Sequence, residues 1–307
     1  MIMSLVDTAK NVILQNLRFE TGETVLIITD DDKKEIADLF YQASKELSDE
    51  AVIIKMPTRN KSGEEPPQMI SGLMKMADVV LCVTKHSLTH TKARKEASEV
   101  GARVATMPGV TMNMLENGAI SADYNEVQEL TEKYCQILNS GENVKIAKDD
   151  YELTFSIKER KSISSTGVFK KPGESGNVPS GESYIAPIED SANGNIVIDG
   201  AVSNIGVLDE PIKLKIESGR LIDATGKNGK KLLELLGDGD GRTIAEFGIG
   251  TNKKARLIGN VLEDEKVFGT VHIAFGSNKS FGGVTEAGVH IDCIIKSPDV
   301  WIDSQKI

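Results

Sequence analysis

The sequence predicts an α/β N-terminal domain with a parallel sheet over residues 1–145, and a β-rich α+β C-terminal domain over residues 146–307. In the first half, continuous apolar runs alternate with segments of helical periodicity. In the second half, short apolar runs are bounded by glycines. The length of 307 residues is sufficient for two domains that each have a core.

The first half repeats a strand followed by a helix. We expect strands at 25–30, 51–57, 78–84 and 103–109, and helices at 4–17, 33–47, 67–76, 91–100, 111–118 and 123–139. Strands that are buried on both faces and alternate with helices form a parallel sheet. No glycine-rich phosphate-binding motif follows any of these strands, which argues against nucleotide binding.

The composition changes after Ser140, where charged residues mix with the two-residue alternation of TFSIKE. This pattern is typical of antiparallel strands, so we place the domain boundary near residue 145. The rest of the chain is rich in glycine and short strands. One helix is expected near residues 227–236.

Charge and cysteine usage restrict the class of protein. The chain has 46 acidic and 36 basic residues, a formal net charge of −10, which argues against nucleic acid or an anionic membrane as the main partner. No window reaches the roughly 18 apolar residues of a transmembrane helix. The N-terminus lacks the basic region of a signal peptide. The cysteines, Cys82, Cys135 and Cys293, are odd in number and lack CxxC spacing. We therefore expect a cytoplasmic protein with reduced thiols.

Three apolar runs of the second half carry charged or metal-binding side chains. They read TIAEFGIGTN, KVFGTVHIAFG and GVHIDCII, and they contain Glu246, His272, His290 and Asp292. Side chains alternate along a strand, so His290 and Asp292 point to the same face. A buried carboxylate is costly unless it is paired or coordinates a metal. A shared cation is the simplest explanation for these four groups.

Two other segments hold weaker candidates. Glu182 follows a glycine in SGNVPSGESYIAP, and Tyr184 shares its face two residues later. A glutamate after such a turn is more often a surface residue. The loop KHSLTHTKAR contains His86 and His90. These histidines are more simply solvated loop residues beside a helix cap than metal ligands.

Several motifs together resemble the M29 family of metallo-aminopeptidases, of the aminopeptidase T or AmpS type. They are SLTHTKARKEASEVGARVATMPG, NVPSGESYIAP, EFGIGTN, LEDEKVFGTVHIAFG and GVHIDCIIKSPDVWIDSQKI. The resemblance covers most of the chain. It implies a homodimer acting on peptides, with two divalent ions such as Zn²⁺, Co²⁺ or Mn²⁺. The implied metal ligands are Glu182, Glu246, His272, His290 and Asp292.

The resemblance also implies a mechanism. Two metal ions would activate a bridging water and polarise the scissile carbonyl. Glu246 or Glu182 is the carboxylate nearest in type to a general base. Members of this family carry a tyrosine a few residues after HIAFG, where this shorter chain has Asn278 and Lys279. Lys279 or Tyr184 could supply the missing stabilisation of an oxyanion.

Two alternatives remain open. The chain also resembles the 2,5-dihydroxypyridine ring-cleaving dioxygenases, which bind one iron. Two histidines and one carboxylate suit non-haem Fe(II), and His272, His290 and Asp292 would form that set. The retained Glu182 and Glu246 favour the peptidase interpretation over this one. The second alternative is a non-catalytic metal-binding protein, which the missing tyrosine would explain.

Overall fold

The computed structural model describes residues 4–307. The chain packs into two units. The first runs up to Gln128 and also includes Gly167–Ser180, and the second consists of Glu129–Thr166 and Gly181–Ile307. The sequence led us to expect a single boundary near residue 145. The chain instead crosses between the units three times, because a later segment adds a strand to the first unit.

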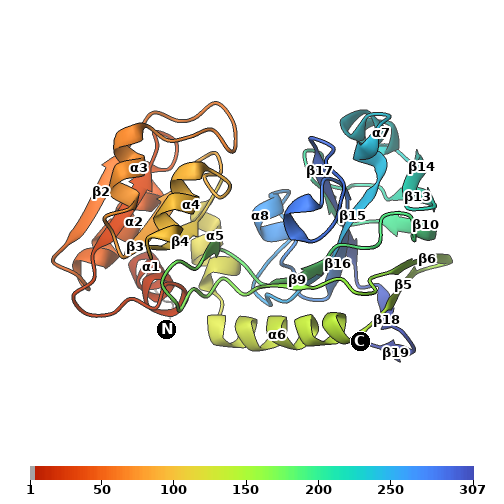
Figure 1. Ribbon diagram of the computed structural model, residues 1–307, viewed down its shortest axis with the longest axis horizontal. Coiled ribbons are helices and arrows are strands. Elements are labelled where there is room, and N and C mark those ends of the chain that lie inside the picture. The colour runs from red at the N-terminus through yellow and green to blue at the C-terminus, as the bar shows by residue number, and fades with distance from the viewer. Residues whose placement is uncertain (1–3) are drawn as a thin grey trace. The chain divides into compact units, whose positions relative to one another are not determined.

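The first unit is built on a five-stranded parallel sheet in the order β2-β1-β3-β4-β8 (Figure 1). Its strands are β1 (Val25–Thr29), β2 (Ala51–Lys55), β3 (Val79–Val83), β4 (Arg103–Thr106) and β8 (Ser175–Asn177). The first four correspond to the predicted strands. The short strand β8 lacks an apolar run, so its pairing with β4 could not be predicted from periodicity.

Helices cover both faces of this sheet. They are α1 (Leu5–Asn11), which continues as a π-helical turn (Val12–Asn16), α2 (Lys34–Lys45), α3 (Gln68–Met74), α4 (Lys92–Glu99) and α5 (Met112–Glu116). A 3₁₀ turn (Ala119–Ser121) and α6 (Tyr124–Ser140) follow, and α6 contains the crossing into the second unit. Ile27 of β1 packs with α1 and α2, whereas Ile28 packs with α3 and α4. Both faces of the strand are therefore buried, as the apolar runs predict.

The second unit contains two antiparallel sheets of seven strands each. Sheet B has the order β14-β13-β10-β6-β5-β18-β19, and sheet C has the order β12-β11-β17-β16-β15-β9-β7. The strands of sheet B are β5 (Asn143–Lys148), β6 (Tyr151–Ser156), β10 (Asn193–Ile198), β13 (Ile212–Glu217), β14 (Arg220–Thr225), β18 (Asp299–Ile302) and β19 (Gln305–Lys306). Those of sheet C are β7 (Ile163–Ser165), β9 (Glu182–Ile185), β11 (Ala201–Val202), β12 (Gly206–Val207), β15 (Ile244–Gly250), β16 (Thr270–Gly276) and β17 (His290–Lys296).

Little helix accompanies these sheets. The helices of the second unit are α7 (Gly229–Leu236) and α8 (Val261–Asp264), with 3₁₀ turns at Asp240–Arg242 and Lys279–Phe281. Helix α7 matches the one predicted for residues 227–236. The predicted fold class, a parallel α/β domain followed by a β-rich α+β domain, is confirmed.

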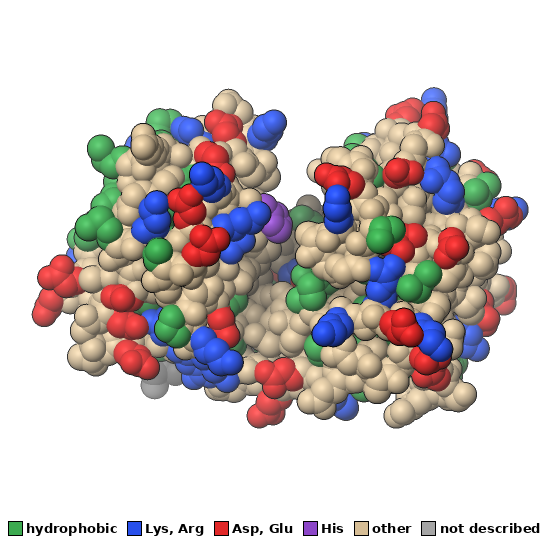
Figure 2. Space-filling model, in the orientation of Figure 1, with side chains coloured by type: hydrophobic (Ala, Val, Ile, Leu, Met, Phe, Trp, Pro, Cys, Tyr) green, Lys and Arg blue, Asp and Glu red, His purple; other side chains and the backbone are tan. Residues whose placement is uncertain are grey.

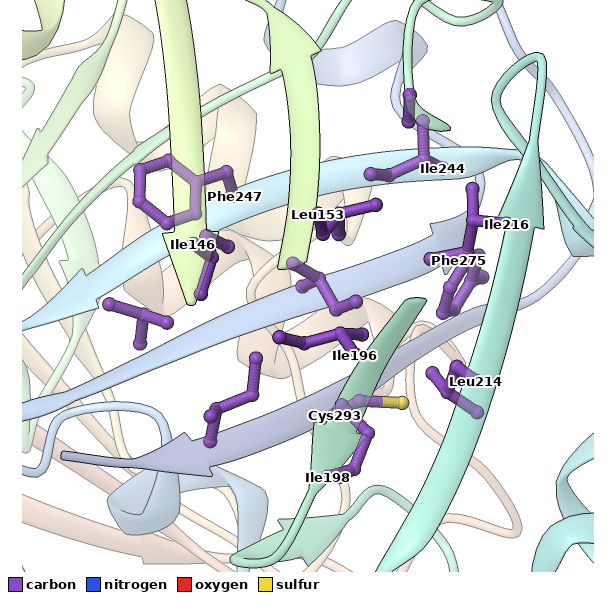
Figure 3. Packing of buried hydrophobic residues seen from close by; sticks show 14 of the residues in the cluster. Ile146, Leu153, Ile196, Ile198, Leu214, Ile216, Ile244, Phe247, Phe275 and Cys293 are labelled. Atoms are coloured by element: carbon purple, nitrogen blue, oxygen red, sulfur yellow. The ribbon is translucent and has the colours of Figure 1, made fainter. Parts of the chain in front are cut away.

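The core of the second unit lies between sheets B and C. Figure 3 shows side chains from both sheets directed toward one another: Ile146, Leu153, Ile196, Leu214, Phe247, Phe275 and Cys293. Phe155 and Phe247 meet edge to face, with ring centroids 5.4 Å apart. Alternate residues of β15, β16 and β17 fill this core. The residues between them project from the opposite face of sheet C, which we call the ligand face.

The surface carries both signs of charge. Figure 2 shows acidic and basic side chains interspersed over the visible side of each unit, with hydrophobic side chains scattered between them. Small exposed apolar groups of this kind are normal for globular proteins. Among residues 4–307, no helix combines the length and the apolar character that a membrane crossing needs.

Candidate metal centre

The ligand face of sheet C brings together the five predicted metal ligands, which we call the ligand cluster. Glu246 lies on β15, His272 on β16, His290 and Asp292 on β17, and Glu182 on β9. Ala274 on β16 pairs with both Glu246 and Asp292, so its small side chain lies between the two carboxylates. The antiparallel register therefore gathers residues that are more than a hundred positions apart.

A β-bulge directs Glu246 toward the cluster. Ile244 pairs with Phe275, but Glu246 pairs with Ala274, so two steps on β15 match one step on β16. Ile244 consequently faces the core while Glu246 faces the ligands, although their even spacing alone would place them on one face. The bulge re-aims a functional side chain, a role typical of bulges beside active sites.

Glycines on β15 make room for the cluster. Gly248 pairs with His272 on one side and with Tyr184 on the other. A Cβ atom at position 248 would lie 2.1 Å from Nε2 of His272. The imidazole ring therefore lies directly over the glycine, and a larger residue would displace it.

The ligand atoms lie close enough to share a cation. Nε2 of His272 is 3.2 Å from Oε1 of Glu246, and Nε2 of His290 is 3.4 Å from Oε2 of the same carboxylate. His290 Nε2 is also 3.2 Å from Oδ1 of Asp292. Two groups of three potential ligands result, Glu182–Glu246–His272 and Glu246–His290–Asp292, each with its ligand atoms within 4.8 Å of one another. Glu246 belongs to both groups.

Two hydrogen bonds orient the ligands of the second group. Nδ1 of His290 donates to the backbone carbonyl oxygen of Ser277 at 2.8 Å, which leaves Nε2 directed at the cluster. The hydroxyl of Ser203 donates to Oδ2 of Asp292 at 3.0 Å, which leaves Oδ1 directed at His290. Such outer contacts fix the ring orientation and the tautomer of metal-binding histidines.

The protonation of the cluster reflects its excess of carboxylates. Burial disfavours the charged imidazole of His272, but the hydrogen bond and charge of Glu246 outweigh burial and raise its pKa to about 9. Burial also opposes the charged form of His290. The charge of Asp292 and the hydrogen bonds to Asp292 and Glu246 nevertheless raise the pKa of His290 to about 12. Burial would raise the pKa values of Glu246 and Asp292, but the hydrogen bonds and charges of the two histidines hold both values below the usual range. The cluster thus stabilises positive charge, and a bound metal would replace the imidazole protons.

Sequence reasoning missed a buried lysine beside the ligands. Nζ of Lys266 donates to Oε1 of Glu182 at 2.8 Å and also pairs with Glu265. Burial would lower the pKa of Lys266, but the charges of Glu182 and Glu265 raise it above the ordinary value, so the ammonium form persists. A lysine in the acidic run LEDEK, directly before a ligand strand, is the signal that could have indicated it.

An aromatic contact, also unpredicted, lies beside His290. The ring of Phe281 meets the Tyr184 ring edge to face at 5.5 Å and the His290 ring at 5.9 Å. Burial, with the charges of Glu246 and Glu182, raises the pKa of Tyr184, so its phenol keeps its proton. The structure thus brings Tyr184 to the ligand cluster, where the sequence analysis placed it.

Other candidates lie outside the cluster. The side chain of Lys279 is 65% exposed and forms an ion pair with Glu286 at 2.8 Å. It is therefore not positioned by a contact with the ligands, although the sequence analysis gave it a catalytic role. His86 and His90 belong to the first unit, and neither occurs in the ligand groups found among residues 4–307.

Comparison with known proteins connects this site to a family. A family model described as 2,5-dihydroxypyridine 5,6-dioxygenase matches residues 5–307. The chain belongs to this dioxygenase family. No curated protein matches the chain in sequence.

Solved structures show that the fold is shared with two enzyme classes. The 2,5-dihydroxypyridine dioxygenase from Pseudomonas putida has a TM-score of 0.80 at 17% identity, with 99% of this chain and 94% of that chain covered. AmpT from Thermus thermophilus has a TM-score of 0.71 at 17% identity, with 99% and 96% covered. The predicted M29-like fold is therefore supported, whereas the family match is to the dioxygenases.

The ligand cluster fits a metal-dependent member of the dioxygenase family. It offers imidazole nitrogens and carboxylate oxygens, the donors that suit divalent iron, zinc and manganese. Oε2 of Glu182 is buried and, among residues 4–307, has no hydrogen-bond partner, although it lies 3.7 Å from Nε2 of His272. A buried carboxylate oxygen without a partner is costly, which indicates that the cluster is completed by a bound group.

Proposed function

We propose that the protein is a non-haem Fe(II) dioxygenase that cleaves the ring of a hydroxylated pyridine. The gathering of His272, His290 and Asp292 around the shared carboxylate of Glu246 carries this proposal, because the chain belongs to the dihydroxypyridine dioxygenase family. Two histidines and one carboxylate with open positions are the ligands that non-haem Fe(II) oxygenases use.

His272, His290 and Asp292 would hold the iron through Nε2, Nε2 and a carboxylate oxygen. When bound, Fe(II) supplies a site at which O₂ and the substrate are activated together. In the overall reaction a carbon–carbon bond of the ring breaks, both atoms of O₂ enter the product, and the ring is oxidised as O₂ is reduced. Glu246 contacts both imidazoles and would keep their Nε2 atoms directed at the metal.

Aromatic residues beside the ligands support a planar substrate. Phe281 lies against His290, and Tyr184 lies against Phe281. A flat ring gains contact energy from such neighbours through offset or edge-to-face packing. The protonated phenol of Tyr184 could donate a hydrogen bond to a substrate oxygen. These residues would orient the ring, while the charged ligands hold the metal.

Oxygen consumption tests the proposal. Protein loaded with Fe(II) under anaerobic conditions is mixed with 2,5-dihydroxypyridine and then with O₂. We expect one O₂ consumed per ring and loss of the aromatic absorbance, and we expect neither with His290→Ala. The Lys279→Ala variant serves as the matched control, since Lys279 is exposed and paired with Glu286. An iron-loaded protein that leaves hydroxypyridines intact would contradict the proposal.

A metallo-aminopeptidase is the second candidate function. Glu246 occurs in both ligand groups, as a carboxylate that bridges two ions would, and the fold is similar to that of AmpT. In this alternative, two ions such as Zn²⁺, Co²⁺ or Mn²⁺ would activate water, with Glu182 or Glu246 as general base. Release of the first residue from free peptides, but not from N-acetylated ones, would favour this function over the dioxygenase.

We further propose that the protein acts as a homodimer in the cytoplasm and does not require nucleic acid. Light scattering after size-exclusion chromatography measures the mass of the assembly directly. A mass of one chain at micromolar concentration would exclude the dimer. Fractionation of the source cells would test the compartment.

A further inference from the structure

The loop that joins β16 to β17, residues 277–289, contacts His290 at two points. The carbonyl oxygen of Ser277 accepts the hydrogen bond from Nδ1 of His290 at 2.8 Å, and the ring centroid of Phe281 lies 5.9 Å from that of His290. The partner of one ring nitrogen decides which nitrogen is left for a metal. The orientation of His290 therefore depends on where the main chain of this loop lies.

Little apolar packing holds the loop in place. Its exposed residues are Lys279, Ser280, Gly282, Val284, Glu286 and Gly288. Asn278 is the one residue of the loop that is buried, and its exposure is 0%. A segment with few buried apolar contacts opens at a low cost in free energy unless other contacts hold it. In this loop the buried group is a polar amide.

Asn278 closes the loop through both its main chain and its side chain. Its N–H donates to the carbonyl oxygen of Thr285 at 3.1 Å, and its carbonyl oxygen accepts from the N–H groups of Phe281 and Gly283, each at 3.1 Å. The side-chain Oδ1 accepts from the N–H of Thr285 at 2.8 Å. A Cβ atom at Gly283 would lie 1.9 Å from Cγ of Asn278, so the turn packs directly on the amide.

An ion pair outside the loop fixes the other end of the amide. Nδ2 of Asn278 donates to Oε1 of Glu189 at 3.1 Å, and the same oxygen accepts from the N–H of Val284 at 2.7 Å. Oε2 of Glu189 accepts from Arg160 at 2.6 Å, and Arg160 also donates to the carbonyl oxygen of Gly282. The side chains of Glu189 and Arg160 are 17% and 14% exposed. Hydrogen bonds to a charged and largely buried group are stronger than those between neutral groups.

The peptide group between Ser277 and Asn278 transmits this anchoring to His290. It contains both the carbonyl that accepts from His290 and the N–H that donates to Thr285. A peptide group is planar, so its carbonyl cannot turn without its N–H. A displacement of Asn278 would therefore reorient the acceptor of the His290 ring.

We propose that Asn278, held by Glu189 and Arg160, is a positioning residue for the metal ligand His290. It fixes the Ser277 carbonyl that takes the Nδ1 hydrogen bond, so that Nε2 is directed at the metal. None of the three anchoring residues belongs to the ligand groups found among residues 4–307, so their role is indirect. This inference rests on the proposed metal-dependent function and identifies which residues outside the cluster that site needs.

The substitution Asn278→Asp tests the proposal with little change of shape. It keeps Oδ1 for Thr285 and replaces the Nδ2 donor with an oxygen that would face Oε1 of Glu189. Protein with ¹⁵N-labelled histidine is loaded with Zn²⁺ and studied by NMR, and its affinity for Mn²⁺ is measured by calorimetry. In the wild type we expect a slowly exchanging ring N–H resonance from His290, identified by its absence in His290→Gln.

In Asn278→Asp this resonance should be lost, because the ring no longer has a fixed acceptor. The Kd for Mn²⁺ should rise about 10-fold, the lower end of the effect of removing a contact that orients a ligand. The double variant Asn278→Asp/Glu189→Gln removes the repulsion between two carboxylates. It should regain the resonance and bind Mn²⁺ more tightly than Asn278→Asp.

A second variant keeps the test decisive if Asn278→Asp does not fold. Gly283→Ala places a Cβ atom against the Asn278 amide, at a position whose backbone is not left-handed, and we expect the same losses. Ser280→Ala, exposed in the same loop, is the matched control and should keep both the resonance and the affinity. The absence of the resonance in the wild type would overturn the proposal.

An unchanged resonance and an unchanged Kd in folded Asn278→Asp or Gly283→Ala would also overturn it. These measurements need no turnover, so they are independent of the reaction. If they give the expected results and the iron-loaded wild type does not consume O₂ with a hydroxypyridine, the proposed function alone is wrong.

Discussion

Gly248 lies directly opposite His272 across the β15–β16 pair, and the imidazole ring fills the space that a side chain at position 248 would need. A metal-binding histidine is here positioned by the absence of a neighbouring Cβ atom. Glycine in a central strand usually weakens it, and a close approach of this kind is the physical reason to retain one.

We therefore expect Gly248→Ala to displace His272. The added Cβ would lie 2.1 Å from Nε2, so the ring or the strand must move. Such overpacking typically costs about 1–3 kcal/mol of stability. Misorientation of a ligand should weaken metal binding by about 10- to 100-fold. Gly239→Ala is the matched control, because a Cβ atom at Gly239 meets nothing within 4 Å. Equal metal affinity in the two variants would contradict this explanation.

Metal removal should lower the thermal stability of the protein. A metal that binds the native state alone stabilises it by about 2.7 kcal/mol at a free concentration of 100 times Kd. We expect the melting temperature to fall with chelator and to recover with Fe(II), Mn²⁺, Zn²⁺ or Co²⁺. His290→Ala should abolish this response, whereas His86→Ala in the first unit should keep it. A chelator effect of the same size in His290→Ala would place the metal elsewhere.

Replacement of Phe281 should weaken substrate binding more than metal binding. Its ring contacts Tyr184 and His290, and an aromatic pair contributes about 0.5–1.5 kcal/mol beyond its buried area. For Phe281→Ala we expect KM for a hydroxypyridine to rise about 2- to 10-fold, with the metal content unchanged. Lys279→Ala alters the same turn at an exposed position and should change KM by less than about twofold. Equal kinetics in both variants would exclude a contact between Phe281 and the substrate.

Glu189 should make the stability of the loop after β16 depend on pH. It accepts hydrogen bonds from Asn278 at 3.1 Å, from the N–H of Val284 at 2.7 Å and from Arg160 at 2.6 Å. Burial alone would raise its pKa, but these partners lower it below the usual value. A lowered folded-state pKa adds stability above the unfolded value of about 4.3, and this stability is lost as the pH falls.

The difference in the free energy of unfolding between the wild type and Glu189→Gln should therefore be largest at neutral pH. We expect the difference to shrink as the pH falls below about 4. Glu286→Gln is the control, since its carboxylate is exposed and pairs with exposed Lys279. A constant difference between wild type and Glu189→Gln from pH 7 to pH 3 would contradict a stabilising charge at this position.

The sequence by itself determined the fold class, and it predicted Glu246, His272, His290 and Asp292 as candidate ligands, to which the resemblance to the M29 family added Glu182. Periodicity predicted four of the five strands of the parallel sheet, because strands such as β1 and β3 are apolar on both faces, whereas β8 has no apolar run. The alternation of side chains along a strand was enough to predict that His290 and Asp292 lie on the same face. Charged groups in apolar runs indicated a cation because burial of an unpaired charge is costly.

Only the tertiary structure decided how these ligands are arranged. The bulge that turns Glu246 away from Ile244, the placement of Lys266 against Glu182 and the contact of Phe281 with Tyr184 all depend on pairing between separate segments of the chain. Strand register, bulges and loop packing depend on the whole sheet, so local patterns carry no signal for them. The position of Lys279 in the chain made it a candidate, but only the packing of its loop shows that it lies exposed beside Glu286.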